Sequence, residues 1–370
     1  MQRHKKKKVE EESLNCGVQE RMKRKMVLVT GGASFIGSHL VDSLLKMDAD
    51  VVVADDFSSG KLENLEYPLI KKGLDKWEHE HLTVFKGDLK DREFTKLMVK
   101  DADIVFHLAA LHGGRGYIQT HPAECSSNMI LDQLVFEEAH KAGVGQICFA
   151  SSACVYPSYL QEKAGSNYLL KEDDADPFVR DKAFADLEYG WAKLMGEMAL
   201  KAYHREYGMK TAAVRIFTAY GPRENETHAI VALIAKAFIK MEPYVIWGNG
   251  EQDRNFTYVQ DIVDALILAS EKIEDGSVVN AGRSDRLTIN QTIDLVFDLV
   301  GWKPKKIKRD LSKPQGVASR AADLARVGKD LNWSPKISYR EGFKKTIDWY
   351  FANHSVATVK SNLDTSLVER

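Results

Sequence analysis

A tyrosine and a lysine four residues apart form the first group that could do chemistry. The string Tyr189-Gly190-Trp191-Ala192-Lys193 places both side chains on one face of a helix, because residues four apart in a helix lie one turn apart. A phenol has a reference pKa near ~10, and a neighbouring ammonium favours its ionised form. Tyr189 could therefore accept the proton of a substrate hydroxyl. Taken alone, such a spacing more often marks an ordinary surface pair, so its meaning depends on its surroundings.

A glycine-rich turn supplies the second chemical signal. It joins an apolar run at 27–30, which predicts a buried strand, to a run at 35–45 with apolar residues at helical spacing. Gly31 and Gly32 permit a sharp turn close to a phosphate, and Gly37 lets the helix pack tightly on the strand. A pyrophosphate would then meet the helix N-terminus, where unpaired N–H groups favour negative charge.

An acid at the end of the next predicted strand strengthens this interpretation. Asp55 follows the apolar run 51–54, roughly 20 residues after the glycines, where a carboxylate can accept the adenosine ribose hydroxyls of a dinucleotide. A nicotinamide held there could take a hydride from the carbon whose hydroxyl Tyr189 deprotonates, and Lys193 could hold the nicotinamide ribose. The sequence therefore predicts a nicotinamide cofactor. The carboxylate favours NAD over NADP, because it would repel a 2′-phosphate.

The elements that must position these groups alternate between strand and helix. Further apolar runs predict buried strands at 82–85, 104–108, 147–151 and 211–217. Such alternation is typical of a doubly wound parallel sheet of the Rossmann type in the α/β class, on which ligands bind outside the carboxyl ends of the strands. We therefore expect one crevice to be lined by Asp88, His107-Leu108-Ala109-Ala110 and Ser151-Ser152.

A long helix and a second lobe should complete the architecture. The helix runs from Asp186, its predicted N-cap, to Tyr207 and carries the tyrosine and lysine. The remaining pattern predicts a smaller C-terminal substrate lobe that is interleaved with the first domain. The expected boundaries are a polar, disordered tail at 1–25, the NAD-binding domain at 26–217 with returns at about 256–281, the substrate lobe at 218–255 and 282–351, and a loose C-terminal tail at 357–370.

Composition limits the function classes. The chain has 370 residues, of which 44% are hydrophobic and 28% charged, the balance of a soluble globular protein. Its formal net charge of -1 does not point to nucleic acid or an acidic membrane as the partner. The four cysteines lack the spacing of a metal site, which predicts a reducing, cytoplasmic setting without a disulfide framework or bound metal. No apolar run approaches the ~20 residues that span a bilayer.

These motifs together resemble the extended short-chain dehydrogenase/reductases. The match covers nearly everything from Met26 to Phe351 and rests on Thr30-Gly31-Gly32, Phe35-Ile36-Gly37, Asp55, Asp88, His107-Leu108-Ala109-Ala110, Ser151-Ser152 before Val155-Tyr156, and Tyr189 with Lys193. The resemblance implies bound NAD, a nucleotide-sugar substrate between two lobes, and Ser152, Tyr189 and Lys193 as a catalytic set. It implies cofactor contacts from Gly31, Ser34, Phe35, Ile36, Gly37, Asp55, Asp88, Leu89, Leu108, Ala109, Ala110, Tyr189 and Lys193. Ser34 stands where a third glycine is usual, so the phosphate is expected to sit slightly differently.

A cysteine narrows the resemblance further. The family's 4,6-dehydratases would require an Asp-Glu pair where Ala153 and Cys154 stand, so elimination of water is not expected. The string around Cys154 is instead similar to that of GDP-mannose 3,5-epimerases and GDP-fucose synthases, whose cysteine acts as an acid/base beside a 4-keto group. The same resemblance places the second acid/base on His228. Reference pKa values near ~8.5 and ~6.5 suit proton exchange near neutrality. Taken alone, either residue is more often structural.

The resemblance also implies residues that grip the substrate. Arg254 and Arg320 match positions that bind the sugar-nucleotide diphosphate, for which guanidinium forks have a suitable geometry. The other expected substrate contacts are Gly114, Arg115, Thr218 and Lys236.

We therefore expect a cytoplasmic, homodimeric NAD-dependent enzyme that epimerises a nucleotide sugar, preferably GDP-mannose at C5 and C3. Tyr189 would deprotonate the C4 hydroxyl, Cys154 would remove a proton beside the new ketone, and His228 would deliver one from the opposite face. Three alternatives stay open: an epimerase-reductase like GDP-fucose synthase, a 4-epimerase of UDP-sugars, and a non-catalytic dinucleotide sensor. The cysteine and histidine argue against the 4-epimerase, and the complete catalytic set argues against the sensor.

Overall fold

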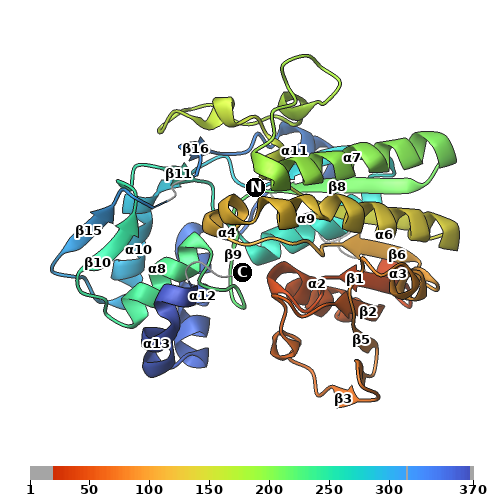
Figure 1. The fold of residues 1–370 in the computed structure, drawn as a ribbon, viewed down its shortest axis with the longest axis horizontal. Helices are drawn as coiled ribbons and strands as arrows, with labels where there is room; N and C mark the ends of the chain where they lie inside the picture. Colours follow the sequence, from red (N-terminus) through yellow and green to blue (C-terminus); the bar gives the residue numbers. More distant parts are fainter. Residues whose placement is uncertain (1–19, 314–315, 367–370) are drawn as a thin grey trace, which may run out of the picture.

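The structure of the chain is a computed structural model that describes residues 20–313 and 316–366. Most of the predicted polar tail, residues 1–19, lies outside the described residues. Residues 20–25 already belong to the fold, because Met22 is buried in the core and the Arg24 N–H donates to the Asp48 carbonyl at 2.8 Å. Figure 1 shows a large sheet with helices packed against it, beside a smaller group of strands and helices.

The large sheet has nine strands in the order β13-β8-β7-β6-β1-β2-β5-β4-β3. Strands β13 to β5 of this order pair in parallel, and β4 and β3 add an antiparallel hairpin at one edge. The bounds are β1 Met26–Thr30, β2 Asp50–Asp55, β3 Ile70–Lys71, β4 Lys76–His79, β5 Leu82–Lys86, β6 Ile104–His107, β7 Gln146–Ser152, β8 Lys210–Ile216 and β13 Asp275–Ala281. The strand order reverses between β1 and β6, which is where such sheets bind ligands.

Helices cover both faces of this sheet. One face packs against α2 Phe35–Leu45 and α9 Val259–Lys272, whereas the other packs against α3 Arg92–Val99, α6 Asn128–Ala142 and α7 Leu187–Tyr207. The helices α4 Arg115–Thr120 and α5 Pro122–Ser126 and the short helices η1 Leu62–Asn64, η2 Ala153–Val155, η3 Ser158–Gln161 and η4 Glu172–Ala175 lie in the connections. The parallel strands are therefore buried on both sides, as their continuous apolar runs require.

The smaller lobe consists of short strands and helices from the second half of the chain. Its strands form three small sheets: β9 Ala219–Tyr220 with β12 Thr257–Tyr258, β10 Tyr244–Trp247 with β15 Ile307–Asp310, and β11 Asp253–Arg254 with β14 Leu287–Thr288 and β16 Ser319–Arg320. Its helices are α8 Ala229–Phe238, α10 Ile289–Val300, α12 Tyr339–Asn353 and α13 Val356–Ser366, whereas α11 Ala325–Leu331 packs against α9 and the edge strand β13 of the large sheet.

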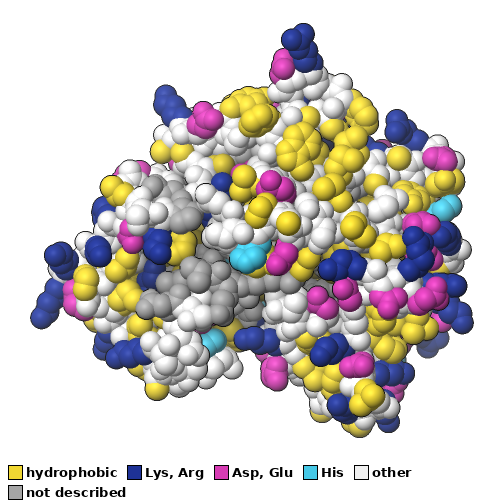
Figure 2. Space-filling model, viewed as in Figure 1, with side chains coloured by type: hydrophobic (Ala, Val, Ile, Leu, Met, Phe, Trp, Pro, Cys, Tyr) yellow, Lys and Arg dark blue, Asp and Glu magenta, His cyan; other side chains and the backbone are white. Residues whose placement is uncertain are grey.

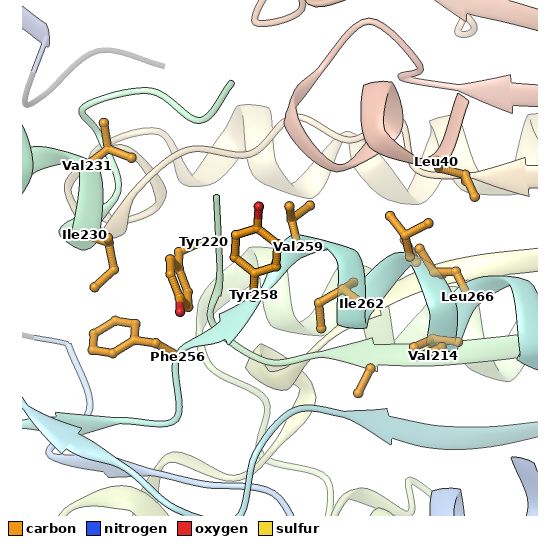
Figure 3. Packing of buried hydrophobic residues seen from close by; sticks show 14 of the residues in the cluster. Leu40, Val214, Tyr220, Ile230, Val231, Phe256, Tyr258, Val259, Ile262 and Leu266 are labelled. Atoms are coloured by element: carbon orange, nitrogen blue, oxygen red, sulfur yellow. The ribbon is translucent and has the colours of Figure 1, made fainter. Parts of the chain in front are cut away.

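One hydrophobic core continues from the sheet into the smaller lobe. Figure 3 shows Leu40 and Leu266 at one end and the rings of Tyr220 and Phe256 beside Ile230 at the other, and all belong to one buried cluster. Shared packing of this kind fixes the two lobes relative to each other. The cleft between them is therefore built on a common core.

Two segments differ from the sequence prediction. The segment 256–269, expected as a return to the sheet, is mostly helix α9, which packs on the sheet face. Residues 357–366 of the expected loose tail belong to α13, Val356–Ser366, whose Val359 and Leu363 are buried one turn apart in the core. Their four-residue spacing supplied an apolar face to pack against α8.

The surface carries mixed charge. Figure 2 shows basic and acidic side chains interspersed over the visible face, in keeping with the net charge of -1. Within the described ranges, no helix is long and apolar enough to cross a membrane. The same residues contain no cluster of three histidine, cysteine or acidic side chains that could hold a metal ion.

Candidate active site

One cavity of about 1000 Å³ opens at the carboxyl ends of the central strands and extends between the lobes. Its walls come from the β1–α2 turn, the loop after β6, the end of β7, the start of α7, and the smaller lobe. It brings together most predicted site residues: Gly31, Ser34, Phe35, Ile36, Gly37, Leu108, Ala109, Ala110, Gly114, Arg115, Ser152, Cys154, Tyr189, Lys193, Thr218, His228, Lys236, Arg254 and Arg320. Asp55, Asp88 and Leu89 do not line it.

The β1–α2 turn forms a backbone cradle at the N-terminus of α2. Gly31 has a φ of +69°, and a Cβ there would lie 2.9 Å from the Ala109 nitrogen. A Cβ at Gly37 would lie 2.2 Å from the Gly31 carbonyl oxygen, so only glycine lets the helix pack on the turn. The Ser34 hydroxyl makes no capping hydrogen bond to α2. A dinucleotide pyrophosphate binds to backbone N–H groups at a helix N-terminus, and it needs a turn in which no side chains cover those groups.

Gly37→Ala is expected to release the cofactor. The new methyl would push α2 away from the turn, and strain of about 1–3 kcal/mol should lower cofactor retention by about fivefold to about 10²-fold. Acid release followed by mass spectrometry measures the NAD content of the purified variant. Gly116→Ala is the control, because a Cβ at Gly116 meets nothing within 4 Å. A full complement of NAD in Gly37→Ala would show that close packing of the turn is not needed.

Asp55 ends β2 beside the same cradle. Its Oδ2 accepts a hydrogen bond from the Ala33 N–H and its Oδ1 accepts one from the Phe57 N–H, both at 2.9 Å. The carboxylate is thus fixed next to the glycine turn, and its contact with the ribose stays a prediction. Asp88 is exposed and Leu89 is buried at the end of β5, and their cofactor contacts also stay predictions.

Tyr189 and Lys193 both lie on α7 and line the cavity, as their spacing predicts. The Nζ of Lys193 lies 6.0 Å from the centre of the Tyr189 ring. Burial raises the pKa of Tyr189 well above its ordinary value and lowers the pKa of Lys193. Desolvation thus opposes the phenolate in the ligand-free cavity, and the role of Tyr189 as a base stays a prediction.

Lys193 supplies the second test of the cofactor's fit. Its side chain is 1% exposed, and no described residue accepts a hydrogen bond from its buried Nζ. A buried ammonium without acceptors is costly, and the hydroxyls of a nicotinamide ribose would satisfy it. The glycine cradle at one end and the unsatisfied lysine at the other therefore fit a nicotinamide dinucleotide.

Cys154 lies in the short helix η2, which begins directly after Ser152. The Ser152 hydroxyl accepts a hydrogen bond from the Cys154 N–H at 3.1 Å. The Cys154 carbonyl accepts the Asp186 N–H at 2.8 Å, which joins η2 to the start of α7. Cys154 packs in one apolar cluster with Tyr189, and the Arg320 Nη1 donates to its Sγ at 3.7 Å. A neighbouring cation and partial exposure are typical surroundings of a reactive cysteine.

His228 is the N-cap residue of α8 and lines the cavity. Its ring stacks on His112 with the ring centres 5.4 Å apart, and His112 lies 4.8 Å from the Tyr189 ring. The ring of His112 thus connects Tyr189 to His228. Burial lowers the pKa of His228 to about 4, so the reference value assumed from sequence does not hold and the ring is neutral near pH 7.

A buried carboxylate organises the arginines of the cavity. The Arg115 Nη1 donates to both oxygens of Asp186 at 2.9 Å, and the Arg320 Nη2 donates to Oδ2 at 3.4 Å. Asp186 does precede α7, but its side chain makes no capping bond because the guanidinium groups occupy it. The Arg254 Nη2 donates to the Val317 carbonyl at 2.6 Å. Burial and then the charge of Arg320 lower the pKa of Arg254 to about 9.

The other predicted substrate residues complete this wall. The Lys236 Nζ donates to the Val245 carbonyl at 2.9 Å. Gly114 contacts the backbone of Thr227, where an added Cβ would lie 2.0 Å from the carbonyl oxygen. Thr218 lines the cavity between the two lobes.

Several cavity residues were not assigned a role from the sequence. His112 belongs to a loop that the resemblance covers, but only the fold shows that its ring joins Tyr189 to His228. Asp186 was read as a helix cap, whereas it holds two arginines. The end of α12 contributes Trp349, Asn353 and His354, for which the sequence offers no signal.

Comparison with known proteins places the chain in a family. The NAD dependent epimerase/dehydratase family model matches residues 27–282, more than half of the chain, so the protein belongs to this family. GDP-mannose 3,5-epimerase of Arabidopsis thaliana is 29% identical over 329 residues, covering 87% of this chain and 81% of the plant enzyme. The predicted recognition, an enzyme of the NAD-dependent nucleotide-sugar epimerase class, is confirmed.

Solved structures agree with the fold. UDP-N-acetylglucosamine 4-epimerase from Methanobrevibacter ruminantium, in complex with UDP-N-acetylmuramic acid, is 30% identical with a TM-score of 0.76, covering 90% of this chain and 100% of that one. Thermus thermophilus UDP-glucose 4-epimerase in complex with NAD is 25% identical with a TM-score of 0.74, covering 89% and 100%. The Rossmann-type α/β fold and NAD as cofactor are thereby confirmed.

Proposed function

We propose that this epimerase acts in the manner of a GDP-mannose 3,5-epimerase, by oxidising C4, exchanging protons beside the ketone and reducing C4 again. The observation that carries the proposal is the joint position of Cys154 and His228 in the cavity of Tyr189. The cysteine packs with the tyrosine, and the histidine reaches it through His112. Inverting C3 or C5 needs such an acid/base pair, whereas inverting C4 alone does not.

The side chains divide the work as follows. NAD supplies the hydride acceptor and donor for C4. Tyr189 accepts the C4 hydroxyl proton, for which its phenol must first be ionised. Burial raises the pKa of Tyr189 and opposes this ionisation, whereas a cationic nicotinamide in the cavity would favour it. Lys193 holds the nicotinamide ribose, and Ser152 positions the hydroxyl. Cys154 removes a proton beside the ketone, and His228 returns one.

The arginines support a nucleoside diphosphate as the handle of the substrate. Arg115, Arg254 and Arg320 line one cavity, and Asp186 pairs with Arg115 and Arg320. The pKa of Arg254 is lowered to about 9, first by burial and then by the positive charge of Arg320. A diphosphate would offset this charge and accept bidentate hydrogen bonds.

A UDP-sugar 4-epimerase is the second candidate. Relatives with that activity in their names are as similar to the chain as the GDP-mannose enzyme, at 30% against 29% identity. The reductase alternative is weaker, because the Asp55 carboxylate beside the cradle disfavours the 2′-phosphate of NADPH.

Assembly as a homodimer in the cytoplasm belongs to the same proposal. Helices α6 and α7 lie side by side and expose large apolar side chains, namely Met129, Ile130, Trp191 and Met195. Such a surface suits a self-complementary contact with a second copy. Cys148 and Cys154 are present as thiols, in keeping with a reducing compartment.

A substrate panel in heavy water tests the function. GDP-mannose, UDP-glucose, UDP-glucuronate and a GDP-4-keto-6-deoxy sugar are each incubated with the protein and followed by NMR. We expect deuterium at C3 and C5 of GDP-mannose, together with new epimers. Inversion of a UDP-sugar at C4 without deuterium uptake would overturn the proposal and establish the 4-epimerase.

A further inference from the structure

Glu224 lies beside His228 in the wall of the cavity, and no sequence motif pointed to it. Its side chain is 3% exposed, and its Oε1 lies 3.5 Å from the Nδ1 of His228. Its Oε2 is buried and has no hydrogen-bond partner among the described residues. A buried carboxyl with an unsatisfied oxygen lowers the stability of a fold. Glu224 lies against His228, a predicted proton donor, so a role in the reaction would explain why this loss of stability is tolerated.

His228 alone is a poor proton donor. Its lowered pKa, about 4, leaves the imidazole neutral near pH 7. If a neutral imidazole gave up its single N–H proton, it would become imidazolate, which is a strong base. A neutral imidazole is therefore a weak acid for delivering a proton to carbon. The donor therefore requires a second proton from a neighbour. Burial raises the pKa of Glu224 well above its ordinary value, so its carboxyl keeps a proton.

The Thr227 hydroxyl oxygen also lies near the His228 Nδ1, at 3.3 Å, and this hydroxyl donates to the Asn225 Oδ1 at 2.5 Å. The other polar groups around Glu224 and His228 have partners elsewhere. His112 stacks on His228 from the loop after β6, and Arg115 of α4 is paired with Asp186. On the side of α12, the Tyr350 hydroxyl donates to Glu226 at 2.6 Å. Of the acids in the described segment before α8, Glu224 is the one in contact with the imidazole.

We propose that Glu224 is a positioning residue that orients His228 and supplies its proton, an inference that rests on the proposed function of His228. As the Nε2–H bond breaks and a C–H bond forms on the substrate, the Glu224 O–H bond breaks and Nδ1 takes that proton. The products are a neutral imidazole and a carboxylate, while Cys154 keeps the proton removed from the sugar. Exchange with water restores both groups before the next turnover.

Glu224→Gln tests the inference, because the amide keeps the shape but carries no transferable acid proton. Deuterium delivery beside C4 is measured from about pH 8 to about pH 5 and expressed relative to wild type, so that pH effects common to both proteins cancel. At about pH 8 we expect a loss of about 10²-fold, the lower end for general acid catalysis. The loss should shrink as the pH falls toward the His228 pKa of about 4, where the ring carries its own proton. Transient reduction of NAD should be unchanged.

Two further variants separate this role from a structural one. Glu224→Asp keeps a carboxyl group. Its rate of deuterium delivery can be lower than that of wild type, but the ratio of the two rates should not change with pH. Glu271→Gln is the matched control, because the Oε2 of Glu271 in α9 is also buried without a described partner and lies outside the cavity. A wild-type protein without C–H exchange would refute the proposed function. If deuterium delivery in Glu224→Gln equals that of wild type, or is reduced by the same factor at every pH, the inference about Glu224 is wrong and the proposed function stands.

Discussion

Tyr189→Phe is expected to stop oxidation at C4 while leaving the cofactor bound. The change removes only the hydroxyl, and the ring keeps its contact with His112 at 4.8 Å. Without a group to accept the C4 hydroxyl proton, hydride transfer should slow by about 10²–10⁴-fold, the usual contribution of a general base. Lys193 and the glycine cradle are untouched, so acid should still release NAD from the variant. The absorbance of reduced nicotinamide after mixing with substrate measures the step directly.

Supplying the ketone should bypass this loss. A GDP-4-keto-6-deoxy sugar already carries the group that acidifies the neighbouring C–H bonds, so Tyr189→Phe should exchange deuterium into it as wild type does. Failure with both substrates would show that Tyr189 also serves the acid/base step. Oxidation of GDP-mannose at the wild-type rate would remove Tyr189 from its assigned role.

The parts of the fold that could be predicted are those with a strong local signal. Helix α2 spans Phe35–Leu45 as predicted, because its apolar residues repeat cleanly, and α10, Ile289–Val300, carries the same kind of repeat. In α10 the Thr288 side chain also forms a capping box with Gln291. The β3–β4 hairpin gave no such signal, since its residues are half-buried or exposed and mostly polar.

The site was predictable where one motif places a residue at a strand end or a helix turn. The contacts between distant segments were not. Asp186 and Arg320 are 134 positions apart, and only the fold brings the carboxylate of one to the guanidinium of the other. The same limit applies to pKa values, because the neutral state of His228 results from burial that the sequence does not display. Glu224 was missed for both reasons.

Cys154→Ala is expected to separate oxidation from epimerisation. The backbone bonds of Cys154 to Ser152 and Asp186 do not involve the thiol, so η2 should keep its place. Transient reduction of NAD by GDP-mannose should proceed as in wild type, because Tyr189 and Lys193 are untouched. Deuterium uptake at C3 and C5 should fall by about 10²–10⁴-fold. With the GDP-4-keto-6-deoxy sugar, Cys154→Ala should show the same loss of deuterium exchange, whereas Tyr189→Phe should exchange deuterium as wild type does.

Cys148→Ala is the matched control for the loss of a thiol. Cys148 lies in β7, its Sγ donates to the Leu266 carbonyl at 3.5 Å, and burial raises its pKa well above the ordinary value. Removing it should lower stability through a small cavity and leave deuterium exchange intact. If Cys154→Ala instead exchanged and epimerised at the wild-type rate, Cys154 would be a packing residue. Another group in the cavity would then have to remove the proton beside the ketone, and Cys154 would lose its assigned role.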